Sequence, residues 1–270
     1  MESDLTNATL IRREDLTESL SIVRVRPDSG VVPRFTPGQF VRLGVPRGPA
    51  PGQPAAGSGR RAGRVRLTRR AYSIASAPTV PDWLEFFVVR VEEGRLTPRL
   101  WEIDPGGTLW MDDTAKGEFT LDVAPPDKDL VMVSTGTGVA PFLSMLRTYR
   151  GQGRWRRFVL VNGVRRVADL GYRGELEAIA SEDPTVTYIP LVTLEDEGSA
   201  WEGLRGRVQT ALEPGTYAEL VGAPLTPACC HVFLCGNPAM ITDVQRLLEA
   251  RGFVTDSREQ RGTIHFERYW

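Results

Sequence analysis

Residues 129–150, DLVMVSTGTGVAPFLSMLRTYR, decide the fold of the second half of this chain. Residues 129–134 form a continuous apolar run, which is typical of a strand buried on both faces of a sheet. Residues 140–150 carry apolar side chains at helical spacing, and Pro141 suits the first turn of a helix. The two elements are joined by a short glycine turn. This order predicts an α/β domain built on a parallel sheet.

The alternation of apolar strands and helices continues to the end of the chain. It predicts strands at 157–161, 186–193 and 231–235, helices at 170–180, 207–212 and 238–251, and a last strand around His265. We therefore expect a five-stranded parallel sheet. Such sheets bind ligands at the carboxyl ends of their strands.

The first half has a different pattern. Short segments rich in Val, Leu, Ile and Phe, separated by Gly and Pro, predict a small antiparallel barrel or sandwich. These segments are residues 21–26, 39–45, 64–68, 72–75 and 84–91. Residues 46–63 consist almost entirely of Gly, Pro, Ala, Ser, Gln and Arg, and predict a solvated hairpin loop. We place the boundary in Ala124-Pro-Pro-Asp127, which gives domains at 1–125 and 126–270.

The composition excludes several classes of protein. The 33 Lys and Arg residues nearly balance the 34 Asp and Glu residues, so no global field attracts nucleic acid. No apolar run approaches the roughly 20 residues of a membrane span, and the first ten residues lack the features of a signal peptide. Three cysteines are too few for a disulfide framework. We expect a cytoplasmic protein without a metal site, because neither of the two histidines has a second histidine at ligand spacing.

Two segments carry residues suited to binding a nucleotide. Gly136 and Gly138 let the backbone approach an anion at a helix N-terminus, although a tight turn that simply needs glycine fits the same pattern. Arg70 can make a forked contact with phosphate, and Tyr72 points to the same side of its strand, where its ring could lie on a flat heterocycle. Ser73 follows with a hydroxyl group. A half-buried strand with Tyr in the core and Arg in water is the alternative.

These segments, taken in order along nearly the whole chain, resemble the bacterial ferredoxin–NADP reductases. The matching pieces are Phe35-Thr-Pro-Gly-Gln-Phe40, Arg70-Ala-Tyr-Ser73, Gly94-Arg-Leu-Thr97, Gly136-Thr-Gly-Val-Ala-Pro141, Gly163-Val-Arg165, Gly206-Arg207, Cys235-Gly-Asn-Pro238 and Glu267-Arg-Tyr-Trp270. The resemblance implies an antiparallel β-barrel that binds FAD, followed by the α/β domain that binds NADP(H). It also implies electron transfer between NADP(H) and ferredoxin or flavodoxin by hydride exchange at flavin N5.

The resemblance also implies roles for individual residues. Ser73, Cys235 and Glu267 would lie where the nicotinamide meets the flavin. The expected flavin-binding residues are Arg70, Ala71, Tyr72, Ser73, Val89, Gly94, Arg95, Leu96, Thr97, Tyr269 and Trp270. The expected NADP(H)-binding residues are Gly136, Thr137, Gly138, Arg165, Arg166, Arg207, Gly236 and Asn237. The terminal aromatic residues would have to move aside before a nicotinamide can stack, so we expect a conformational gate.

The sequence departs from the family pattern at two places. An arginine that usually helps to clamp the 2′-phosphate is Leu194 here, which leaves the preference between NADPH and NADH open. Arg166 or Arg205 could compensate. The basic loop 46–63 is long, and either steers an acidic partner or is a solvated loop.

Alternatives for the whole chain also stay open. A reductase of free flavin, quinone or an oxygenase component would use the same cofactors, and a nucleotide-binding regulatory subunit would use them without turnover. We expect a monomer.

Overall fold

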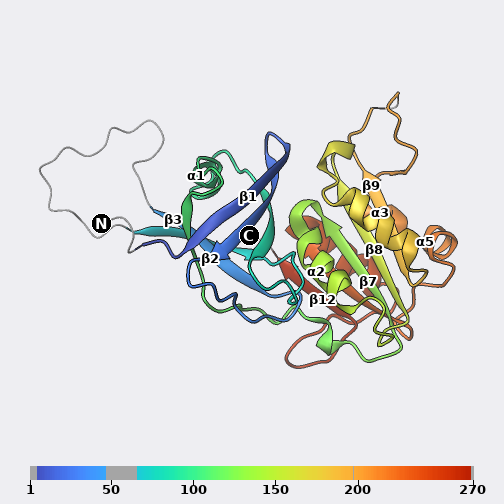
Figure 1. Cartoon of the computed structure of the whole chain (residues 1–270). Helices are drawn as coiled ribbons and strands as arrows, with labels where there is room; N and C mark the ends of the chain where they lie inside the picture. Colours follow the sequence, from blue (N-terminus) through green and yellow to red (C-terminus); the bar gives the residue numbers. More distant parts are fainter. Residues whose placement is uncertain (1–4, 47–65, 197, 269–270) are drawn as a thin grey trace, which may run out of the picture. The chain divides into compact units, whose positions relative to one another are not determined.

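The computed structural model describes residues 5–46, 66–196 and 198–268, and they form two compact units, Met1–Gly117 and Glu118–Trp270. Figure 1 shows the strands and helices of both units. We describe each unit by itself.

The first unit is an antiparallel barrel. Its elements are β1 (Ala8–Thr17), β2 (Leu20–Pro27), β3 (Phe40–Pro46), β4 (Leu67–Ser73), β5 (Leu84–Val89), α1 (Thr97–Trp101) and β6 (Thr108–Met111). The strands pair in the order β4-β3-β6-β1-β2-β5. Just beyond β4, the Ala75 amide donates to the carbonyl oxygen of Glu85 in β5 (2.8 Å), so the two edge strands meet and the barrel closes. Side chains such as Leu10, Leu43 and Phe86 fill its interior.

The second unit is a parallel sheet covered by helices. After the 3-10 turn η1 (Leu121–Val123) come β7 (Asp129–Thr135), η2 (Gly136–Val139), α2 (Ala140–Tyr149), β8 (Arg157–Val164), η3 (Val167–Asp169), α3 (Arg173–Glu182), β9 (Val186–Val192), β10 (Leu204–Arg205), α4 (Val208–Ala211), α5 (Pro214–Val221), β11 (Cys230–Gly236), α6 (Pro238–Glu249) and β12 (Ile264–Arg268). The strand order is β10-β9-β8-β7-β11-β12, and all five pairings are parallel. The order therefore changes direction at β7, between β8 and β11.

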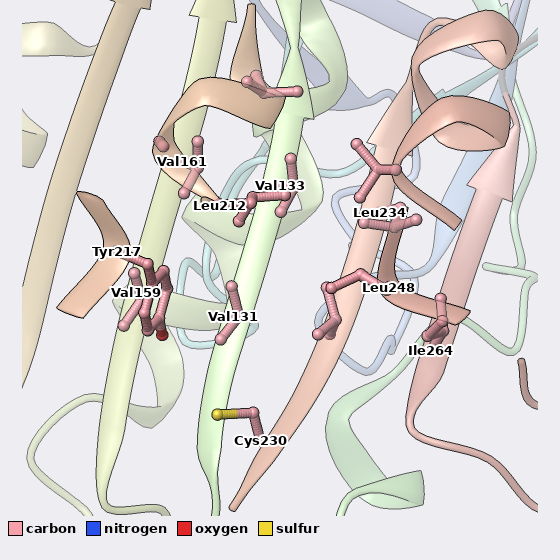
Figure 2. Close-up of a cluster of buried hydrophobic side chains, with 14 of the residues drawn as sticks. Val131, Val133, Val159, Val161, Leu212, Tyr217, Cys230, Leu234, Leu248 and Ile264 are labelled. Carbon is pink, nitrogen blue, oxygen red and sulfur yellow. The ribbon is translucent and has the colours of Figure 1, made fainter. Parts of the chain in front are cut away.

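One hydrophobic core of the second unit lies on one face of this sheet. Figure 2 shows Val131 and Val133 of β7 with Val159 and Val161 of β8 on this face. Residues of α4, α5 and α6 cover it, including Leu212, Tyr217 and Leu248. The other face carries Leu130, Met132 and Phe158, which are also buried. Burial on both faces is the physical reason for the continuous apolar runs in the sequence.

The predicted fold class is confirmed, with one difference in the strand count. The parallel sheet has six strands where the sequence predicts five, because the two-residue strand β10 pairs with Leu191 and Val192 at the edge of the sheet. A strand of two residues is too short to show an apolar period. In the barrel, the separate segments predicted at 64–68 and 72–75 are replaced by the single strand β4.

Candidate functional site

The glycine turn after β7 lies against the end of β11. Gly136 has a positive φ of 54°, and a Cβ atom at Gly138 would overlap the carbonyl oxygen of Cys235. Only glycine fits at position 138 without moving one of these two backbones. Neither η2 nor α2 has a side-chain cap at its N-terminus. The Ala140 amide at the start of α2 already donates to the Thr137 carbonyl, and Pro141 has no N–H group. The backbone amides presented at the point where the strand order changes direction are therefore those at the start of η2.

The turn after β11 is tied to the same place. The Asn237 amide donates to Thr135 Oγ1 (3.0 Å), and its side-chain oxygen accepts from the Ala239 amide (2.8 Å) to cap α6. Gly236 has a φ of 136°, and a side chain there would overlap the hydroxyl of Thr135. The two strand-to-helix turns thus form one packed edge. A side chain caps the start of α6, whereas no described side chain caps the start of η2.

Cys235 and Glu267 are direct neighbours across β11 and β12. The two residues are register partners in the parallel ladder, so their side chains leave the same face of the sheet. Cys235 is completely buried and Glu267 is half-buried. Their 32-residue separation in the sequence gives no sign of this contact. The structure therefore places a thiol beside a carboxylate at the carboxyl end of the sheet.

Three arginines lie at the other side of the same edge. Arg165 and Arg166 follow β8, and Arg207 follows β10. All three side chains are exposed, and no carboxylate of the described residues forms an ion pair with them. Unpaired guanidinium groups at the ends of parallel strands form a positive surface suited to a phosphate.

Leu194 and Arg205 border this positive surface. The Leu194 amide donates to the Arg165 carbonyl (2.8 Å), and its side chain is 57% exposed. Arg205 donates to the carbonyl oxygens of Glu195 (2.7 Å) and Asp196 (3.1 Å) and to the hydroxyl of Ser199 (3.1 Å). Arg205 therefore braces the loop after β9. The sequence does not indicate this bracing role.

In the first unit, Arg70 and Tyr72 share one face of the edge strand β4. Their register partners are Leu43 and Val41 of β3, which point into the barrel. The Tyr72 ring is half-buried and meets Phe86 edge-on, with centroids 6.4 Å apart. Burial raises the pKa of the Tyr72 phenol, and the nearby Arg70 charge opposes that change. Arg70 is exposed and makes no ion pair with a described carboxylate, while Ser73 is buried at the end of the strand and Ala71 is exposed.

The turn between β5 and α1 is held together by Thr97. Its hydroxyl accepts from the Val91 amide (2.9 Å) and donates to the Val91 carbonyl (3.2 Å). A Cβ atom at Gly94 would lie 2.8 Å from the same carbonyl oxygen, so this turn requires glycine there. Leu96 is buried, Arg95 is exposed, and Val89 ends β5. The Thr97 hydroxyl thus shapes the turn.

Some predicted residues lie outside the described part of the chain. These are Tyr269, Trp270 and nearly all of the loop 46–63, of which only Pro46 belongs to a described strand. Among the described residues, there is no group of three or more His, Cys, Asp or Glu arranged to hold a metal ion. The same residues contain no helix with the length and apolar character needed to cross a membrane.

Known proteins are similar to this chain over most of its length. A flavodoxin/ferredoxin–NADP reductase of Escherichia coli is 32% identical over 269 residues, covering 99% of this chain and all of the relative. Ferredoxin–NADP reductase B of Sorangium cellulosum is 39% identical over 235 residues, which is 87% of this chain and 85% of the relative. The chain belongs to the ferredoxin/flavodoxin–NADP reductase family.

Two further comparisons support membership of this reductase family. A sequence model described as an oxidoreductase NAD-binding domain matches residues 132–246, which include the glycine turn and the three arginines. The crystal structure of a ferredoxin NADP+ reductase from Neisseria gonorrhoeae with bound FAD and NADP superposes with a TM-score of 0.81. It is 27% identical, and the match covers 98% of each chain. The protein is therefore an oxidoreductase of this family with the predicted barrel and α/β units.

Proposed function

We propose that this protein binds FAD in its barrel unit and NADP(H) in its α/β unit, and transfers electrons between NADP(H) and ferredoxin or flavodoxin. The observation that carries the proposal is the carboxyl edge of the parallel sheet. There the glycine turn lies between three arginines that form no ion pair with a described carboxylate on one side and the Cys235–Glu267 pair on the other. The order of these groups along the sheet suits an extended dinucleotide with a phosphate at one end and a redox ring at the other.

The middle of this edge fits a pyrophosphate. Residues 136–138 would offer backbone amides at the start of η2, and Gly138 keeps the turn free of a side chain that would move it from β11. Thr137 adds a hydroxyl group, and Gly236 and Asn237 hold the facing turn in place. These residues would position the two central phosphates.

The two ends of the nucleotide would meet different groups. Arg165 and Arg207, with Arg166 beside them, would bind the 2′-phosphate, while Leu194 supplies no charge there. At the other end, Cys235 and Glu267 would line the nicotinamide and hold its amide and ring. Selectivity for NADPH would rest on the arginines after β8 and β10.

The barrel residues fit a flavin dinucleotide. Arg70 offers a forked guanidinium to a pyrophosphate, and Tyr72 offers a ring fixed by its packing against Phe86. Ser73, with Ala71 before it, would lie at the redox edge of the flavin. The turn of Gly94, Arg95, Leu96 and Thr97 would form the rest of the phosphate site, with Val89 beside it. Tyr269 and Trp270 would cover the flavin.

The chemistry of the reaction belongs to the cofactors. Bound FAD and NADP(H) would exchange a hydride between nicotinamide C4 and flavin N5, which requires the two atoms at about 3–3.5 Å. The task of the chain is to bind and orient both rings and to exclude water. No strong acid or base is needed for that step.

Substitution of the arginines tests the nucleotide site. We expect Arg165→Ala and Arg207→Ala each to raise KM for NADPH by about 10- to 100-fold, since a hydrogen bond to a charged group contributes about 1.5–3 kcal/mol. KM for NADH should change little. Steady-state kinetics with both nucleotides measure this. Arg246→Gln, at an exposed arginine of α6, is the matched control and should leave both constants unchanged.

The acceptor is tested with purified ferredoxin and flavodoxin. The proposal predicts NADPH-dependent reduction of at least one of them at a rate well above that of free flavin or a quinone. Equal arginine effects on both nucleotides would argue against the 2′-phosphate site. Rapid reduction of free flavin or quinone with no reduction of either protein would favour the alternative reductase. The monomeric state and the cytoplasmic location stay predictions.

A further inference from the structure

The only two histidines of the chain form a buried pair. His231 lies in β11 and His265 in β12, 34 residues apart in the sequence, and His231 Nδ1 is 3.0 Å from His265 Nε2. Each side chain is 7% exposed. The rings are nearly parallel, with an angle of 8° and centroids 5.3 Å apart, and Phe233 stacks on His265 at 4.7 Å. The nucleotide sites proposed above do not use this pair.

The pair belongs to the same row of side chains as Cys235 and Glu267. In the parallel ladder His265 faces Phe233 and Glu267 faces Cys235. Since side chains alternate along a strand, His265 and Glu267 leave the same face of β12, two residues apart. The strand β12 is at the edge of the sheet, and β11 is its neighbour. The position of Glu267 therefore depends on how firmly β12 is held to β11.

A nearby carboxylate determines which nitrogen of each imidazole carries the proton. Asp256 Oδ2 lies 3.8 Å from His265 Nδ1, and the same carboxylate accepts from the Gly262 amide and pairs with Arg261. A carboxylate beside Nδ1 favours the proton on that nitrogen, which leaves His265 Nε2 as an acceptor. His231 Nδ1–H then donates to it. Both imidazoles are thereby assigned the Nδ1–H form.

Burial keeps the pair neutral. Burial lowers the pKa of His265 to about 4, with His231 and Arg261 acting in the same direction and Asp256 opposing them. Burial also lowers the pKa of His231, with Lys128 adding to the effect and Asp256 opposing it. The hydrogen bond needs one nitrogen without a proton, so it is intact when both rings are neutral and is lost when both are charged.

We propose that His231 and His265 are positioning residues that hold β12 against β11 and so keep the Glu267 carboxylate beside Cys235. The inference rests on the proposed function in one respect, the role of Glu267 at the nicotinamide. The histidine pair thereby limits the activity of the reductase at acidic pH. In the folded state the histidines have pKa values below the ordinary 6.5. An opened β12 therefore binds protons that the native pair does not, and its population grows as pH falls from about 6.5 towards about 4.

The test compares His231→Phe, which keeps an aromatic ring but loses the bond, with His231→Gln, which keeps hydrogen-bonding groups that do not titrate. At neutral pH, His231→Phe should speed amide hydrogen exchange at residues 266–268 by about five- to tenfold, the effect of one lost hydrogen bond. With FAD bound, kcat should fall by a similar factor while KM for NADPH stays within about twofold. His231→Gln should restore most of the protection and make the acidic limb of kcat shallower, since only His265 then titrates.

Wild-type protein and a control variant complete the experiment. Nitrogen-15 spectra of the two imidazoles should show the Nδ1–H form for both. Exchange at 266–268, divided by exchange at Val131–Val133, should rise below about pH 6. Tyr217→Phe removes a buried hydroxyl that has no hydrogen-bond partner among the described residues, and should change neither the exchange nor kcat.

Each arm has a result that overturns the proposal. It is wrong if His231→Phe keeps wild-type exchange and kcat, or if His231→Gln keeps an acidic limb as steep as that of wild type. It is also wrong if β12 and β7 lose protection equally as the pH falls. Should His231→Phe fail to fold, the wild-type spectra and exchange still decide the outcome. A wild-type protein that is not reduced by NADPH would refute the proposed function instead, because the spectra and the exchange do not depend on turnover.

Discussion

At the scale of single residues, the glycine at position 138 has the most demanding environment in the proposed nucleotide site. A Cβ atom there would overlap the Cys235 carbonyl oxygen, which is backbone and cannot turn aside. We expect Gly138→Ala to lower the free energy of unfolding by about 1–3 kcal/mol, as overpacking typically does, and to raise KM for NADPH. Urea unfolding and steady-state kinetics measure the two effects.

A second glycine provides the matched control. Gly174 lies in α3, where nothing stands within 4 Å of an added Cβ atom, so Gly174→Ala should be neutral or stabilise by up to about 1 kcal/mol. If Gly138→Ala behaved like Gly174→Ala, the close approach of the two turns would not matter for binding.

The face on which a site residue lies could be predicted from the sequence where the alternation of side chains along a strand determines it. Arg70 and Tyr72 share a face because they are two apart in a strand, as the sequence indicates. The contacts between distant segments could not be predicted in this way. Cys235 meets Glu267, and His231 meets His265, only because β11 and β12 pair in one particular register. A register is determined by the packing of whole strands, so no local pattern reports it.

At the scale of elements, the ion pair that joins Arg42 of β3 to Asp112 after β6 predicts how the stability of the fold depends on pH. Asp112 follows β6, and its carboxylate accepts from Arg42 Nε (2.8 Å), Arg42 Nη2 (2.8 Å) and the Arg42 amide (2.9 Å). Its side chain is 6% exposed. The Arg42 hydrogen bonds hold the pKa of Asp112 below its ordinary 3.8. The unfolded chain therefore takes up this proton more readily, and the stabilisation is present above about pH 3.8 and lost as pH falls through the lower native value.

We expect Asp112→Asn to lower the free energy of unfolding by about 1–3 kcal/mol at neutral pH, the usual effect of weakening a buried charged hydrogen bond. The difference from wild type should shrink as the pH falls below about 4, since both proteins then lack the charge. Urea unfolding followed by tryptophan fluorescence at several pH values measures this. Asp113→Asn, at the exposed neighbour, is the control. A difference that stays constant into acid would contradict the assignment.

The elements that the sequence misses are those with weak apolar patterns. The strand β1 is long, but after Leu10 it reads Ile-Arg-Arg-Glu-Asp, and most of these side chains face solvent. The strand β1 is held in place by its pairing with β2 and β6. Because those strands come from other parts of the sequence, the residues of β1 alone do not predict it. The short strand β10 is a similar case. The buried strands β7, β8 and β11 could be predicted because each has a continuous apolar run at its centre.

At the scale of the whole molecule, the change of period along the sequence corresponds to the division into two units. The barrel unit carries Arg70 and Tyr72, and the α/β unit carries the glycine turn, the arginines and the Cys235–Glu267 pair. Each unit thus has its own complement of groups suited to one dinucleotide. The net charge of −1 means that an acidic protein partner would be attracted by local basic groups rather than by the molecule as a whole.

The most direct measurement is an absorbance titration without oxygen. The account predicts that the purified protein contains FAD or takes it up in stoichiometric amount, and that NADPH bleaches its yellow absorbance within the time of mixing. The Arg165→Ala variant should need a higher NADPH concentration to reach the same rate of flavin reduction. Its flavin absorbance should be bleached to the same final extent. A protein that binds no FAD, or one whose bound FAD is reduced by neither NADPH nor NADH, would contradict the account.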